Sequence, residues 1–110
     1  MNHPMFELFR PQELEARRPA DQRYLEFLRV NSMSAGLYVL PAGSEDQQLP
    51  HREDELYVVL EGRARFSAGG EERALTGGEI LFVAASVQHR FHDIERDLKV
   101  LVVFAPPESG

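Results

Sequence analysis

Three side chains, two imidazoles and one carboxylate, have the types and spacing needed to hold a metal ion. His51 is followed four residues later by Glu55, and His89 lies further along the chain. Side chains alternate between the two faces of a strand, so His51 and Glu55 can point into one cavity. Such a ligand set leaves coordination positions open for water or substrate, as in non-haem iron sites, and it also suits Zn, Mn, Ni or Cu. The sequence therefore predicts one divalent transition metal, and the ligand types do not select among these ions.

The stretch around His89 indicates which way that imidazole faces. His89 and Phe91 share one strand face, and His92 lies on the other. Phe91 is an expected core residue, so we expect His89 to face inward with it and His92 to lie at the surface. Tyr57 shares the face of Glu55 and is an expected wall of the same cavity. The alternative is a solvated turn at His51 and a core histidine, bonded to a nearby loop, at position 89.

The elements that would position these residues are short strands. From residue 24 onward, branched and aromatic runs alternate with turn residues, a pattern that predicts about seven to nine strands and an all-β sandwich or barrel. Pro11 and Pro19 bound one or two expected helical turns near the start of the chain. We expect an N-terminal extension over residues 1–22, a barrel over residues 23–106 and a solvent-exposed tail over residues 107–110.

Composition restricts the class of protein. The chain has 110 residues, 43% of them hydrophobic, which fits one globular domain. With 12 basic and 18 acidic side chains the net charge is −6, so we expect no nucleic-acid partner. There is no cysteine, which excludes disulfides and thiolate ligands. No apolar stretch approaches the ~20 residues that span a bilayer, and the first ten residues lack a signal sequence, so we expect a cytoplasmic protein without membrane contact.

The spacing around the first histidine resembles a motif of the cupins, small jelly-roll or double-stranded β-helix domains. That motif is Gly, five residues, His-x-His, three or four residues, Glu, six residues and Gly. Gly43, Leu49, His51, Glu55 and Gly62 stand at these positions. The resemblance extends over residues 35–105 and implies an all-β jelly-roll cupin barrel, which the short N-terminal helical segment would precede.

The second cupin motif is also present in spacing. It has Gly, five residues, Pro-x-Gly, two residues, His, three residues and Asn. Gly78, Ala84, Ser86, His89 and Asp93 stand at these positions, so Ala and Ser replace the Pro and Gly of the turn and Asp replaces Asn.

The largest departure from the cupin pattern is Leu49, which stands where the family has its first metal-binding histidine. The resemblance therefore implies three protein ligands, His51, Glu55 and His89. The amide oxygen of Gln48 is a candidate for the vacated position. Leu49 itself becomes an expected cavity-lining residue, together with Tyr57 and Phe91.

The resemblance implies a single-domain cupin that binds one divalent metal and a small oxygen-bearing ligand, as an oxygenase, isomerase or lyase. No acid–base residue stands out, so no catalytic residue is assigned. The alternatives are a non-catalytic cupin that binds or senses a small molecule, and a metal-free dimeric assembly module. We expect the apolar "VLVVFA" segment to be a central strand or one paired across a dimer, and we expect a homodimer, because a barrel of this size leaves a sheet face or an edge strand partly apolar.

Overall fold

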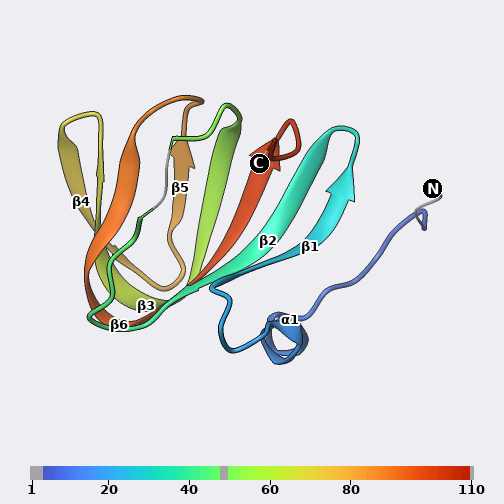
Figure 1. Ribbon diagram of the computed structural model, residues 1–110, viewed down its shortest axis with the longest axis horizontal. Helices are drawn as coiled ribbons and strands as arrows, with labels where there is room; N and C mark the ends of the chain where they lie inside the picture. Colours follow the sequence, from blue (N-terminus) through green and yellow to red (C-terminus); the bar gives the residue numbers. More distant parts are fainter. Residues whose placement is uncertain (1–3, 48–49, 110) are drawn as a thin grey trace.

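The computed structural model describes residues 4–47 and 50–109, which form one antiparallel sheet rolled into a barrel and one short helix (Figure 1). In the described part of the chain, no helix is long and apolar enough to cross a membrane. The sheet order is β1-β2-β6-β3-β4, and β5 pairs with β3. The elements are α1 (Pro11–Arg17), β1 (Tyr24–Val30), β2 (Met33–Leu40), β3 (Asp54–Ala68), β4 (Glu71–Thr76), β5 (Ile80–Val83) and β6 (His89–Ala105). The expected all-β jelly roll with a short N-terminal helix is confirmed.

The two longest strands, β3 and β6, bend and so contribute to both halves of the barrel (Figure 1). They pair antiparallel from Asp54 opposite Ala105 to Ala68 opposite His89, and the register shifts three times along the way. Bulges of this kind bend a strand and increase its twist. Six strands are present in the described ranges, fewer than the seven to nine expected, because β3 and β6 are each one long bent strand.

Gly62 allows the bend of β3. Its φ is 113°, a region that side chains rarely adopt. A Cβ at this position would lie 2.6 Å from the carbonyl oxygen of Asp97 on β6. The close approach of the two backbones therefore requires glycine here.

Asp93 shifts the side-chain alternation of β6. His89 and Phe91 are buried before it, whereas Ile94 and Leu98 are buried after it, so the inward face changes from odd to even positions. Asp93 has a φ of 48°, which aspartate and asparagine tolerate better than most residues. Aspartate can therefore adopt the backbone conformation that this change of alternation requires.

The main core fills the barrel between its two halves. β6 is an internal strand with β2 and β3 on its two sides, so "VLVVFA" is not an edge. The helix α1 packs its buried Leu14 outside the barrel on a smaller apolar group that includes Leu37 and Val39 of β2. The buried members of the main core are Leu40, Tyr57, Val59, Ala64, Phe66, Leu75, Val83, Phe91, Ile94, Leu98, Val100, Val102 and Phe104.

Candidate metal centre

Glu55 and His89 meet inside the barrel although they lie near opposite ends of the β3–β6 ladder. Glu55 pairs with Phe104 and His89 pairs with Ala68, and the bend of the two strands brings the two ends together. Each of the two side chains is only 1% exposed, and Glu55 Oε1 lies 3.3 Å from His89 Nε2. The hydroxyl of Tyr57 lies 3.0 Å from the same nitrogen.

The tautomer of His89 follows from the contact that its Nδ1 atom makes. Nδ1 lies 2.8 Å from the carbonyl oxygen of Val87, which can only accept, so Nδ1 carries hydrogen. In the neutral ring, the single lone pair on Nε2 faces both the Tyr57 hydroxyl and the carboxylate of Glu55, so it can either accept from Tyr57 or bind a cation. The second oxygen of Glu55, Oε2, is buried and has no hydrogen-bond partner among the described residues.

This arrangement leaves two buried acceptors facing each other. A buried carboxylate oxygen without a partner is costly, and such a group in a native structure requires an explanation. A cation between Glu55 and His89 would satisfy both acceptors. A proton on His89 Nε2 would also do so, by forming a buried ion pair, and that is the core-histidine alternative.

His51 stands at the mouth of the barrel, just before β3, and is half-buried. Its ring centroid lies 4.8 Å from that of Phe104 and 6.2 Å from that of His89. Its carbonyl oxygen accepts a hydrogen bond of 2.7 Å from the backbone N–H of Ser86, which has a φ of 66° where the cupin motif has glycine. The structure thus places His51 on the same side of the barrel as the Glu55–His89 pair.

Glu108 is a site residue that the sequence did not indicate. Its Oε2 lies 3.3 Å from Nδ1 of His51, and its side chain is 23% exposed. Burial raises the pKa of Glu108 above its ordinary value, and nearby carboxylates, Glu26 first among them, raise it further, while His51 opposes the shift. No local signal marks this residue, because it lies in a polar tail that was expected to be solvent-exposed.

Aromatic rings lie beside His89 in the core. Phe91 and Tyr57 are fully buried, and the Tyr57 ring centroid lies 6.0 Å from that of His89. Phe66, which was assigned only to packing, is as near, at 5.7 Å. Gln48 and Leu49, the candidate ligand and the expected lining residue, lie outside the described residues.

A cavity of about 200 Å³ adjoins His51. Burial raises the pKa of both its tyrosines, and the hydrogen bond from the Tyr38 hydroxyl to Asp46 Oδ1, 2.7 Å long, raises that of Tyr38 further. The hydroxyl oxygen of Tyr24 is buried and has no partner in the described part of the chain. The cavity is lined by Tyr24, Tyr38, His51, Val102, Phe104 and Glu108.

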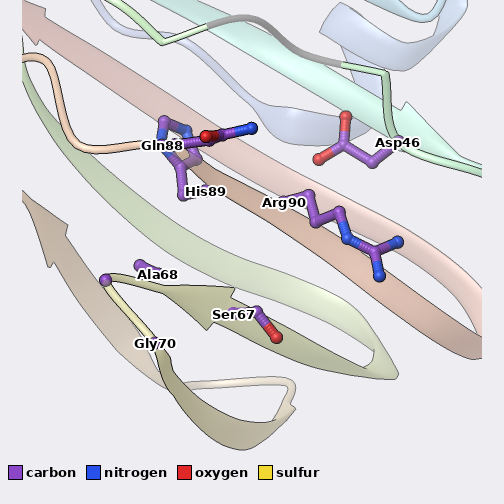
Figure 2. A pocket seen from close by; sticks show the side chains of 8 residues that line it. Asp46, Ser67, Ala68, Gly70, Gln88, His89 and Arg90 are labelled. Atoms are coloured by element: carbon purple, nitrogen blue, oxygen red, sulfur yellow. The ribbon is translucent and has the colours of Figure 1, made fainter.

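A second hollow, of about 370 Å³, lies on the other side of His89, and Figure 2 shows Gln88, Arg90 and Asp46 near it. Because the side chain of His89 is 1% exposed, the imidazole forms a nearly closed wall of this hollow.

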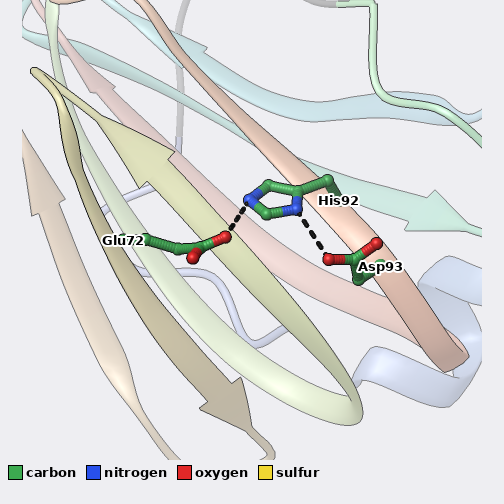
Figure 3. A group of neighbouring side chains, drawn as sticks. All are labelled: Glu72, His92 and Asp93. Carbon is green, nitrogen blue, oxygen red and sulfur yellow. Dashed lines mark hydrogen bonds and ion pairs between the residues drawn. The ribbon is translucent and has the colours of Figure 1, made fainter.

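A different group, Glu72, His92 and Asp93, brings its ligand atoms within 4.8 Å of one another; among the described residues it is the only such group of histidine and acidic side chains (Figure 3). His51, Glu55 and His89 do not approach one another as closely. In Figure 3 the two carboxylates lie at opposite ring nitrogens: Glu72 is 3.0 Å from Nε2 and Asp93 is 3.1 Å from Nδ1. Ser67 Oγ also lies 2.7 Å from Nε2. An imidazole that bridges two exposed carboxylates explains these contacts without a metal.

Known proteins resemble this chain in sequence and in fold. A protein of Streptomyces coelicolor described as uncharacterized is 53% identical over 102 residues, which cover 92% of this chain and 97% of that protein. The crystal structure of TT1209 from Thermus thermophilus is 25% identical, with a TM-score of 0.77, and the match covers 93% of this chain and 99% of that one.

A third similarity is to an enzyme. The crystal structure of the DMSP lyase DddQ from Ruegeria pomeroyi is 25% identical with a TM-score of 0.68, over 81% of this chain and 51% of the lyase. The chain thus spans about half the length of that enzyme. The model of the Cupin domain family matches residues 36–104, more than half of the chain. Together with the two spaced motifs, this match shows that the chain belongs to the cupin family.

Proposed function

We propose that this chain is a cytoplasmic cupin that binds one divalent transition metal through Glu55, His89 and His51. The observation that carries the proposal is the buried pair of acceptors, Glu55 and His89 Nε2, at 3.3 Å. A cation is the simplest partner for two such atoms, because the unpartnered Glu55 Oε2 is also buried. Two imidazoles and one carboxylate suit Fe, Mn, Zn, Ni or Cu.

A bound metal would supply Lewis acidity, which polarises a carbonyl or enolate oxygen, or activate dioxygen. The protein groups have separate tasks. Val87 fixes the tautomer of His89 through the 2.8 Å bond to Nδ1. The hydroxyl of Tyr57, 3.0 Å from His89 Nε2, holds a proton beside the donor atoms. Phe66 and Phe91 exclude water from this part of the barrel.

The ligand of the adjoining cavity is proposed to be small, flat, uncharged and oxygen-bearing. The walls contributed by Tyr24, Tyr38 and Phe104 are aromatic, and about 200 Å³ accommodates a molecule of only a few heavy atoms. The buried hydroxyl of Tyr24 offers a hydrogen bond to a ligand oxygen. The carboxylate of Glu108 repels anions. Small diketones and phenols fit this description.

Metal titration of the purified, metal-free protein by calorimetry tests the proposal. The wild type should bind one Zn²⁺ or Mn²⁺ per chain. Glu55→Gln, which keeps the shape of the side chain, and His89→Ala should each weaken binding strongly, because two remaining ligands hold an ion poorly. His92→Ala is the matched control and should bind like the wild type. Binding lost only in His92→Ala would move the site to the Glu72 group, and no binding by the wild type would refute the proposal.

A second assay distinguishes an enzymatic function from non-catalytic binding of a small molecule. Oxygen consumption and product formation with small diketones, phenols and DMSP, in the presence of the bound metal, would identify an oxygenase, isomerase or lyase. The similarity to the DMSP lyase supports including its substrate. Saturable binding without turnover would support a sensing cupin. A wild type that takes up neither metal nor small molecule would favour the assembly module.

A further inference from the structure

The C-terminal segment turns back onto the barrel after β6 and carries Glu108 to His51 (Figure 1). Hydrogen bonds fix the backbone of Glu108 to the first two strands. Its N–H donates to Oγ of Ser34, a fully buried residue of β2, at 2.9 Å, and its carbonyl oxygen accepts from Arg29 Nη2 of β1 at 2.7 Å. The following residue, Ser109, donates to the buried carboxylate of Glu53 at 2.7 Å.

These contacts are hydrogen bonds rather than apolar packing. The segment contributes no residue to the main core in the described range. Ser34 is a buried polar group whose hydroxyl oxygen accepts a hydrogen bond from this segment. The result is a half-buried carboxylate that lies 3.3 Å from Nδ1 of His51.

The contact favours hydrogen on Nδ1 of His51, which leaves Nε2 to face a cation. A carboxylate accepts from Nδ1–H and thereby places the lone pair of the neutral ring on Nε2. His89 has the same arrangement, because its Nδ1 donates to the Val87 carbonyl oxygen and its Nε2 faces Glu55. Metal-binding histidines commonly donate their second nitrogen to a carboxylate or carbonyl oxygen in this way.

We infer that Glu108 is a positioning residue that orients His51 and fixes its Nδ1–H tautomer, so that the C-terminal segment forms part of the site. This inference rests on the proposed metal site, and it extends that site to a residue 57 positions beyond His51 in the chain. The His51–Glu108 contact itself does not depend on a metal and can be tested without one.

The first experiment measures the tautomer of His51 in the metal-free protein. Two-bond imidazole ¹H–¹⁵N correlation spectra at about pH 8, where an ordinary histidine is neutral, distinguish Nδ1–H from Nε2–H. The chain has four histidines, so assignment by single substitution is practical. His51 should be in the Nδ1–H form in the wild type and in Glu108→Gln, whose amide oxygen still accepts, and should lose this preference in Glu108→Ala. An unchanged tautomer in Glu108→Ala would overturn the inference.

The second experiment measures Zn²⁺ affinity by calorimetry. Loss of an orienting carboxylate typically lowers metal affinity about 10- to 100-fold, so Glu108→Ala should fall in that range and Glu108→Gln should lie closer to the wild type. Glu72→Ala is the matched control, because it removes a carboxylate 3.0 Å from a different histidine, His92, and should not change the affinity. Circular dichroism checks that each variant is folded.

The outcomes separate the inference from the proposed function. Equal affinities of the wild type and Glu108→Ala would overturn the positioning role while the metal site stands. Equal losses in Glu108→Gln and Glu108→Ala, with the tautomer kept in Glu108→Gln, would overturn it in favour of direct ligation by the carboxylate. If the wild type binds no metal, the proposed function fails, and the tautomer measurement still decides whether Glu108 orients His51.

Discussion

Replacing Asp46 should destabilise the protein more than any other change to a single loop carboxylate that we can identify in the described residues. Asp46 lies in the segment between β2 and β3 and is 5% exposed. Its Oδ1 accepts from the Tyr38 hydroxyl at 2.7 Å, and its Oδ2 accepts from the backbone N–H of Phe91 at 2.9 Å. One carboxylate thus ties the loop that leads to His51 onto β2 and β6.

The size of the effect follows from these two bonds. A hydrogen bond to a charged group contributes about 1.5–3 kcal/mol, and Asp46→Ala also leaves two donors unpaired, whereas removal of a buried charge recovers part of the loss. We expect a net loss of about 3 kcal/mol. The entropy of unfolding of a chain of 110 residues is about 0.23 kcal/mol/K near the midpoint, so Tm should fall by about 13 °C.

Thermal unfolding followed by circular dichroism measures this change. Asp46→Asn should lose about half as much, because its amide oxygen can accept from Phe91 while its NH₂ group donates to the Tyr38 oxygen. The control is Asp54→Ala, which removes an exposed carboxylate that accepts one bond, 2.8 Å long, from the N–H of Ala85. Hydrogen exchange at the Phe91 amide should quicken only in the Asp46 variants. A fall in Tm of less than about 4 °C, or no larger than that of Asp54→Ala, would refute the reasoning.

Three further predictions concern other parts of the molecule. Burial raises the pKa of Tyr24 and Tyr38, so their contribution to stability is complete below about pH 10 and is lost as the pH rises further. The absorbance of their tyrosinate forms should therefore appear only together with alkaline unfolding. Its appearance in the folded protein near pH 10 would contradict this prediction. Ser86→Gly should raise stability by about 0.5–1 kcal/mol in thermal unfolding, because glycine removes the strain of a φ of 66°, whereas Ser86→Ala should have no effect. Sedimentation velocity at micromolar concentration should show the expected homodimer. Replacing both Ile80 and Phe82 by serine should weaken the dimer, because these apolar side chains are 66% and 62% exposed on β5. A clean wild-type monomer would contradict this prediction.

Local patterns predicted most of the barrel. Branched and aromatic runs predicted strands from residue 24 onward, where β1 begins, and the alternation of strand faces placed Phe91 in the core. The same alternation turned His89 inward, and the spacing of the two motifs led to the family. These features depend on neighbours within a few residues, and that is the range over which sequence periodicity carries information.

The features that were missed depend on distant contacts. The bend in β3 and β6 requires the backbones at Gly62 and Asp97 to approach each other closely. No sequence pattern links these two positions. Glu108 was read as part of a solvated tail because its environment is created by Ser34, on β2, and Arg29, on β1. Long-range contacts of this kind leave no periodic signal.

The two halves of the candidate site differ in how they are held, and this difference bears on how metal affinity is set. Glu55 and His89 lie on paired strands in the core, where close packing leaves few alternative rotamers. His51 precedes β3 and Glu108 follows β6, so both lie at the barrel mouth and are held chiefly by hydrogen bonds. A cation would therefore meet a rigid pair, Glu55 and His89, and a less rigid His51. Ordering His51 on binding would lower the metal affinity unless Glu108 already holds it in place. Substitutions at the mouth should accordingly change metal affinity with little effect on folding, whereas substitutions at Glu55 or His89 should change both.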